Sequence, residues 1–154
     1  MTNYQTTIII IIIRQQIKLL EERECYMRQV KDLVPKNKFD FSGMEELRKL
    51  SDEEIASVIP DLLAWMKDMN WPVAKEMPAL LVLHQKALIP HIIEILQPEQ
   101  SECDWKYYII VFLLPLLDDD YLLMLKPSLE RIVNNPTSGE LDERTNEVAA
   151  DILK

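Results

Sequence analysis

Apolar side chains along much of this chain recur at intervals of three and four residues. Two such runs follow Trp71 and Trp105; the first contains Val73, Met77, Leu80 and Leu81, and the second contains Tyr108, Ile109, Phe112, Leu113 and Leu116. This spacing places the apolar residues on one face of an α-helix. The pattern therefore predicts two helices that each bury one face.

Three more apolar segments begin at a proline. Pro60, Pro90 and Pro127 each stand at the head of such a segment, with Ile or Leu one or two positions before them. Proline suits the first turn of a helix, because its missing N–H would have no partner there in any case. The prolines therefore predict three helix starts, spaced by 30 and 37 residues.

Serine and glutamate at a spacing of three residues mark further helix starts. Ser42 with Glu45, and Ser51 with Glu54, both fit the capping box. In this motif the serine side chain accepts from a backbone amide and the glutamate reaches back to the serine N–H. One short helix is therefore expected to end near Leu50, just before the second box.

The residues that introduce the two tryptophan-led helices correspond to each other, since Asn70-Trp71 matches Asp104-Trp105 at an offset of 34 residues. We expect Asn70 to bond a free amide at the helix start. Pro72 should fix the first turn and push Trp71 out of helical backbone geometry. Trp71 would then lie over the seam between two helix pairs, either as a packing residue or as an exposed anchor for a partner.

A period of 30 to 40 residues built from helix pairs is typical of stacked α-hairpins. We therefore predict an all-α protein. Residues 27–154 are expected to form a short right-handed α-α superhelix of about three HEAT-like helix pairs, preceded by an extension over residues 1–26. Pro78, which falls within the helix after Trp71, should kink or shorten that helix.

The stretches LVPKNKFD, LRKLSDEE and IPDLLAWMKDMNWPVAKEM resemble a family of small, uncharacterised bacterial proteins. That family is marked by an N-W-P-V/I-A motif, matched here by Asn70, Trp71, Pro72, Val73 and Ala74. The resemblance covers roughly Val30 to Leu153. It implies a HEAT-like or armadillo-like helical fold, and it brings no established activity and no catalytic residues.

The N-terminal segment contains six consecutive isoleucines, from Ile8 to Ile13. A spanning helix needs about 20 apolar residues, and Arg14 interrupts this run too early. A secretory signal begins with positive charge, whereas Met1 to Thr7 contains no Lys or Arg. We therefore expect neither a membrane span nor export.

Three interpretations of this segment remain open. In the first, an amphipathic helix joins copies of the chain through residues 8–27; its stripe at an a/d spacing consists of Ile10, Ile13, Ile17, Leu20 and Met27, interrupted by Glu24. In the second, the isoleucines form an aggregation-prone strand. In the third, Met27 is the natural start, because purine codons for residues 21–24 would resemble a ribosome-binding site.

Charge and composition narrow the classes of function. The chain has 17 basic and 26 acidic residues, for a net charge of −9, whereas nucleic-acid binding needs a basic face. We therefore expect no nucleic-acid partner and favour a protein partner with a basic surface. Only two cysteines are too few for a disulfide framework, which favours a reducing compartment and hence the cytoplasm.

Few residues of the chain are suited to catalysis or to metal binding. His84 and His91 are the two histidines, and His91 with Glu94 supplies only two potential metal ligands. Cys103 is expected at a helix start, but its acidic neighbours on both sides oppose thiolate formation. We therefore expect no catalytic residue, no metal and no cofactor.

This architecture favours a non-catalytic protein-binding module, of which an acidic inhibitor or immunity-type protein is one instance. The second helices, starting at Pro60, Pro90 and Pro127, should form most of its concave surface. Candidate contact residues are Trp65, Trp71, Trp105, Tyr107, Asp118, Asp119 and Asp120. Two alternatives remain: a small enzyme with His84, His91 and carboxylates in a cleft, and a structural homo-oligomer.

Overall fold

The computed structural model describes residues 2–154, and side chains from Tyr4 onward, as helices and connecting loops without a strand. The all-α prediction is therefore confirmed. The α-helices are α1 (Thr2–Asp32), α2 (Met44–Lys49), α3 (Asp52–Ile55), α4 (Ile59–Ala64), α5 (Met77–Leu81), α6 (Gln85–Ile95), α7 (Cys103–Tyr108), α8 (Asp119–Asn134), α9 (Ser138–Asp142) and α10 (Thr145–Ile152). Short 3₁₀-helices lie beside them at η1 (Trp65–Lys67), η2 (Val73–Glu76), η3 (Val82–His84) and η5 (Leu114–Leu116), and a π-helical turn lies at η4 (Ile109–Leu113).

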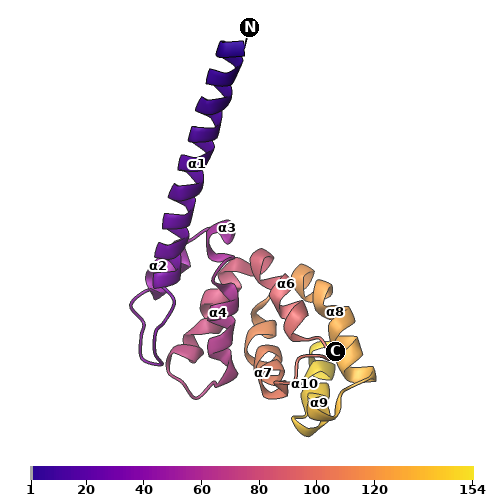
Figure 1. The fold of residues 1–154 in the computed structure, drawn as a ribbon. Helices are drawn as coiled ribbons and strands as arrows, with labels where there is room; N and C mark the ends of the chain where they lie inside the picture. The colour runs from indigo at the N-terminus through magenta and orange to yellow at the C-terminus, as the bar shows by residue number, and fades with distance from the viewer. Residues whose placement is uncertain (1) are drawn as a thin grey trace.

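The body is built from two rows of helices. In one row α4 packs against α6, and α6 packs against α8 (Figure 1). In the other row α5 packs against η4, and η4 against α10. The apolar faces of both rows contribute to one core, whose fully buried members include Leu62, Leu81, Ile92, Ile109 and Ile132. Burial of these side chains is what holds such short helices in place, because helices of this length are marginal alone.

Helix α1 projects away from the body (Figure 1). Every described side chain from Tyr4 to Tyr26 is exposed. Attachment begins where the Tyr26 hydroxyl donates to Glu54 Oε1 at 2.7 Å, and Val30 is buried. The isoleucine run is helical, so the strand interpretation is wrong. Met1, the first residue of the expected extension, lies outside the described residues.

In the described residues, no helix has an apolar stretch long enough to cross a bilayer. This finding includes α1, in which Arg14 and Lys18 follow the isoleucines within two turns.

One of the two expected capping boxes is present. The Ser51 N–H donates to Glu54 Oε2 at 2.7 Å, and the Glu54 N–H donates to Ser51 Oγ at 3.3 Å. The box expected at Ser42 is wrong, because Gly43 is the N-cap of α2. Ser42 instead donates its hydroxyl to Asp40 at 2.6 Å. This bond, with the Lys36 and Ser42 N–H groups, lowers the pKa of Asp40 to about 2.

The prolines mark helix starts in only one of three cases. Pro60 lies in the first turn of α4, as expected. Pro90 and Pro127 lie inside α6 and α8, so the starts predicted there are wrong. Both side chains are exposed. The carbonyl that each proline leaves without an amide partner one turn earlier is therefore on the solvent side, where water can satisfy it.

The Asn-Trp-Pro segment is a loop rather than a capped helix start. Asn70 donates its N–H and side-chain amide to Asp68 Oδ1, at 2.9 and 3.0 Å, so the predicted N-cap role of Asn70 is wrong. Trp71 lies before η2, whereas Trp105 lies inside α7, so the two are not equivalent. Pro78 sits in the first turn of α5, and the helix expected there is shortened as predicted.

A buried ion cluster joins the C-terminal helices. The Lys106 ammonium and the Glu140 carboxylate are fully buried and lie 2.7 Å apart. Arg131 donates to both carboxylate oxygens of Glu140. Lys106 also donates to the Gln97 carbonyl at 2.7 Å, and Arg131 to the Leu96 carbonyl at 2.6 Å. The cluster therefore ties α7, α8 and α9 to the end of α6.

Hydrogen bonds decide the ionisation of Glu140. Burial alone would raise the pKa of this carboxyl. The hydrogen bonds from Arg131, Lys106 and the Thr137 N–H outweigh burial and hold the pKa of Glu140 at about 2. The carboxylate is therefore charged throughout the neutral and mildly acidic range.

This depressed pKa predicts acid sensitivity. Glu140 stabilises the folded state above its ordinary pKa of 4.5, and the contribution is lost as the pH falls toward the folded-state pKa of about 2. Between pH 7 and pH 3 the loss from this group should be about 2 kcal/mol. Urea unfolding of the wild type and Glu140→Gln at both pH values checks this. The difference in free energy of unfolding between the wild type and Glu140→Gln should be smaller at pH 3 than at pH 7. An equal difference at both pH values would contradict the low pKa of Glu140.

Candidate partner-binding site

A hollow of about 170 Å³ lies on one flank of α4. Its lining residues are Pro60, Leu63, His91, Glu94, Ile95, Gln100 and Trp105. The first two come from α4, the next three from α6, and Trp105 from α7. The spacing of three residues between Pro60 and Leu63 places both on the same side of α4. Glu94 is exposed and adds a carboxylate beside largely apolar walls.

Trp105 forms a rigid wall of this hollow. Its side chain is only 8% exposed, and its Nε1–H donates to the Leu63 carbonyl at 3.0 Å. The Lys67 ammonium lies 4.6 Å from the ring centroid and pairs with Glu102 at 2.6 Å. These contacts fix the indole on more than one side. We conclude that Trp105 shapes the site and offers little surface of its own.

A second, more open hollow of about 370 Å³ lies on the other flank of α4. It is lined by Val34, Asp61, Ala64, Trp65 and Trp71. Trp65 and Trp71 meet edge to face, with ring centroids 5.4 Å apart and planes at 71°. Both rings are half-buried, and Asp61 is exposed at the start of α4. Each hollow therefore combines a tryptophan wall with a carboxylate.

The other predicted contact residues line neither hollow. Tyr107 lines a separate polar hollow of about 260 Å³, together with Asp104, Tyr108, Asp142, Glu143 and Arg144. Asp118 lies at the N-cap position of α8 and accepts from Gln85 Nε2 at 3.0 Å. Asp119 and Asp120 are exposed in the first turn of α8. The structure thus brings Trp65 and Trp71 together, places Trp105 across α4 from them, and leaves Tyr107 and the aspartates elsewhere.

Asp61 and Glu94 line the hollows but were not predicted as partner contacts, and Glu94 was considered only as a potential metal ligand. Asp61 follows Pro60 by one position, and Glu94 follows Pro90 by four positions. Both lie inside segments that the sequence pattern predicts to be helical. A helical plot starting at Ile59 would place Asp61 with Trp65 on one side of α4, four residues apart. Glu94 and Trp105 line one hollow because of how α6 and α7 are placed relative to each other, which no local sequence pattern contains.

The two histidines lie in different surroundings. His84 is buried, with Nδ1 3.1 Å from Asp52 Oδ1 and with Nε2 lacking a partner among the described atoms. His91 lines the smaller α4 hollow, and no hollow described here is lined by both. Cys103 is buried and Cys25 is exposed, both as free thiols. Across residues 2–154, no three His, Cys, Asp or Glu side chains are grouped so as to hold a metal ion.

The fold and this surface define a small all-α protein of layered short helices with two solvent-open hollows beside α4. The sequence model of the family described as "Domain of unknown function (DUF5071)" matches residues 33–153, and the chain belongs to this family. The match includes every residue that lines the two hollows and leaves out the whole of α1. No curated protein matches the chain.

Proposed function

We propose that this protein is a non-catalytic binding module that holds a protein partner with a basic surface on the face around α4. The observation that carries the proposal is the pair of hollows beside one helix, each with a tryptophan wall and a carboxylate. Tryptophan is one of the residues most enriched among the side chains that carry the binding energy of protein interfaces. The apolar stem of a Lys or Arg can lie against an indole while its cation meets a carboxylate.

The charge distribution supports a basic partner. Residues 1–26 contain three basic and three acidic residues, so the whole net charge of −9 belongs to residues 27–154. A body with this excess attracts a cationic protein and speeds its association, above all at low ionic strength. We further propose that the helix rows form a right-handed HEAT-like superhelix in the cytoplasm, and that an inhibitor or immunity-type role toward a basic effector is one instance of the function.

Capture from the native cell tests the proposal. The full chain is immobilised and exposed to extract at low and high salt, and each captured protein is purified and rebound to the purified chain. A single dominant partner with a basic surface, bound more tightly at low salt, is expected. Absence of any partner that rebinds at either salt would overturn the proposal.

Two substitutions locate the binding face. Trp71→Ala should weaken rebinding by about 30-fold or more, as expected for an anchor residue. Glu94→Gln should chiefly slow association and reduce its salt dependence. Affinity and rates are measured by surface plasmon resonance, with circular dichroism melts to show that the variants fold. The matched control is Phe112→Ala with Glu130→Gln, two exposed residues of η4 and α8 that line neither hollow; an equal loss in this control would exclude the α4 face.

A further inference from the structure

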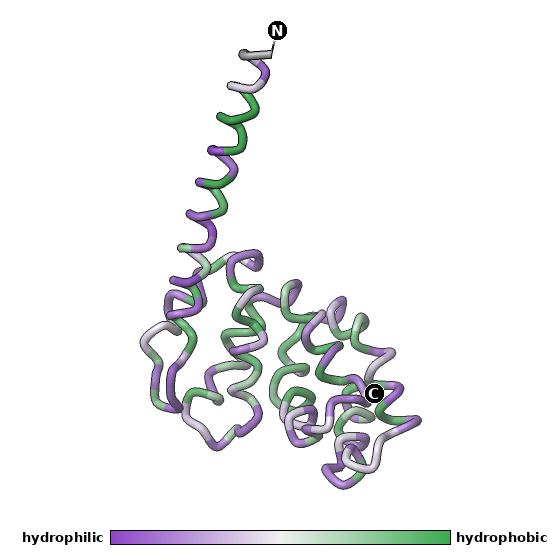
Figure 2. The backbone as a smooth tube through the Cα atoms, in the orientation of Figure 1, coloured by the Kyte–Doolittle hydropathy of each residue, from purple (hydrophilic) through white to green (hydrophobic). Residues whose placement is uncertain are grey.

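The isoleucine-rich part of α1 is an apolar surface that the rest of the chain leaves uncovered. Ile10, Ile13 and Ile17 are 44, 50 and 49% exposed, and Leu20 is 60% exposed. Figure 2 shows these turns as apolar bands on a helix that stands clear of the body. Contiguous exposed apolar side chains mark an interaction surface, and most of the stability of helices in proteins comes from packing of their apolar face.

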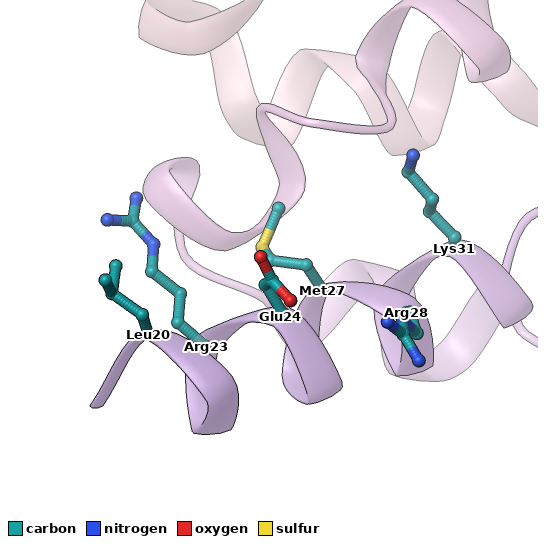
Figure 3. Close-up of a pocket in the computed structure, with 6 residues that line it drawn as sticks. All are labelled: Leu20, Arg23, Glu24, Met27, Arg28 and Lys31. Atoms are coloured by element: carbon teal, nitrogen blue, oxygen red, sulfur yellow. The ribbon is translucent and has the colours of Figure 1, made fainter. Parts of the chain in front are cut away.

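The exposed side chains are ordered along one stripe. Positions 10, 13, 17, 20, 24 and 27 follow the alternating spacing of three and four residues that defines a coiled-coil seam. The stripe runs on into a hollow of about 420 Å³ along the last turns of α1 (Figure 3). The residues that line it are Leu20, Arg23, Glu24, Met27, Arg28 and Lys31. Thus the seam stays open up to the point where α1 meets the body.

We propose that α1 is a self-association helix that pairs in antiparallel orientation with α1 of a second copy of this chain. With Ile13 opposite Ile17 of the second copy, Ile10 falls opposite Leu20, and the two-fold symmetry repeats both layers. Such a seam is isologous, since the same surface serves both chains. Its paired layers run from Thr6 to Glu24, about 27 Å at 1.5 Å per residue.

The charges of the chain select this orientation. In a parallel pair, Glu24 would face Glu24 of the other copy within the seam, and like charges there oppose pairing. The antiparallel layers instead place Glu24 opposite Thr6. They also hold the two bodies, which carry the net charge of −9 each, at opposite ends of the paired helices. Residues 1–26 carry no net charge. A second copy of the same helix therefore suits this segment better than a strongly charged surface would.

Solution mass tests the association. Sedimentation equilibrium of the full chain should give the mass of a dimer. Ile13→Glu with Ile17→Glu should give a monomer, because it puts carboxylates into the two central layers. Gln5→Glu with Gln15→Glu adds the same charge outside the seam and should stay associated. A monomeric wild type, a polydisperse aggregate, or equal behaviour of the two variants would overturn the proposal.

The exposed native Cys25 reports the orientation. Nitroxide labels on Cys25 should lie about 30 Å apart in the antiparallel pair, because this residue faces position 5 of the other copy, 20 residues away at 1.5 Å each. Cys103 is buried and is therefore protected from labelling. Double electron–electron resonance measures the distance. A separation near 10 Å, the width of two adjacent helices, would show a parallel pair and contradict the proposal.

Discussion

Replacing Glu140 by alanine is expected to lower the free energy of unfolding by about 3–5 kcal/mol, the range for breaking a buried ion pair. The change leaves the fully buried Lys106 without its counterion and removes two bonds from Arg131. It also removes the capping box of α9, in which Glu140 accepts from the Thr137 N–H at 2.9 Å. Urea unfolding at pH 7, followed by circular dichroism, measures the loss.

Two further variants show whether charge burial is the cause. Lys106→Met should cost less than Glu140→Ala, because Arg131 still neutralises the carboxylate and methionine fills much of the space. Glu143→Ala, an exposed acidic residue three positions away, should change stability by at most about 0.5 kcal/mol. If Lys106→Met proved the more damaging change, the account of the cluster given above would be contradicted.

Gly43→Ala is expected to destabilise the protein by about 3 kcal/mol, the upper end of the range for forced overpacking. A Cβ at this position would overlap the backbone carbonyl of Leu33, and it would lie 2.8 Å from both the carbonyl carbon and the Cα of that residue. The end of α1 and the start of α2 would have to separate, since neither backbone segment can yield alone. A thermal melt measures the effect.

Gly139→Ala is the matched control for this substitution. The added Cβ would lie 2.9 Å from Cys103 Sγ, which belongs to a side chain. A side chain can adjust more easily than a backbone, so this variant should lose clearly less stability than Gly43→Ala. Equal losses would mean that the close approach of Leu33 to Gly43 is not the source of the effect.

Local patterns predicted the helices better than their ends. The segment after Trp105 is helical and the capping box at Ser51 is present, because each depends on residues within one or two turns. The predicted burial of that segment's apolar face is wrong at Phe112 and Leu116, which are 43 and 48% exposed. The starts predicted at Pro90 and Pro127 are wrong, since an exposed proline can be accommodated inside a packed helix. The capping box predicted at Ser42 is absent because the Ser42 hydroxyl donates to Asp40 and does not accept from a helix amide. Such local hydrogen bonds of serine compete with helix capping.

The candidate site was predicted in part. Trp65 and Trp71 were named from the sequence, and the structure places them edge to face in one hollow. Trp105 was named too, yet its indole is held by the Leu63 carbonyl and contributes mainly shape. Glu94 was considered only as a potential metal ligand with His91. Only the tertiary placement of α6 and α7 brings Glu94 and Trp105 to the same hollow.

The order of apolar and polar residues was sufficient to specify a helical protein, the sites of most helices, and an isoleucine stripe in need of cover. These features follow from side chains only a few positions apart, whose relation is set by 3.6 residues per turn. Packing between distant helices determined the rest. It decided that Lys106 is buried against Glu140, that His84 lies beside Asp52, and that hollows flank α4. Such contacts join residues 30 or more positions apart, and no periodic pattern records which helix faces will meet.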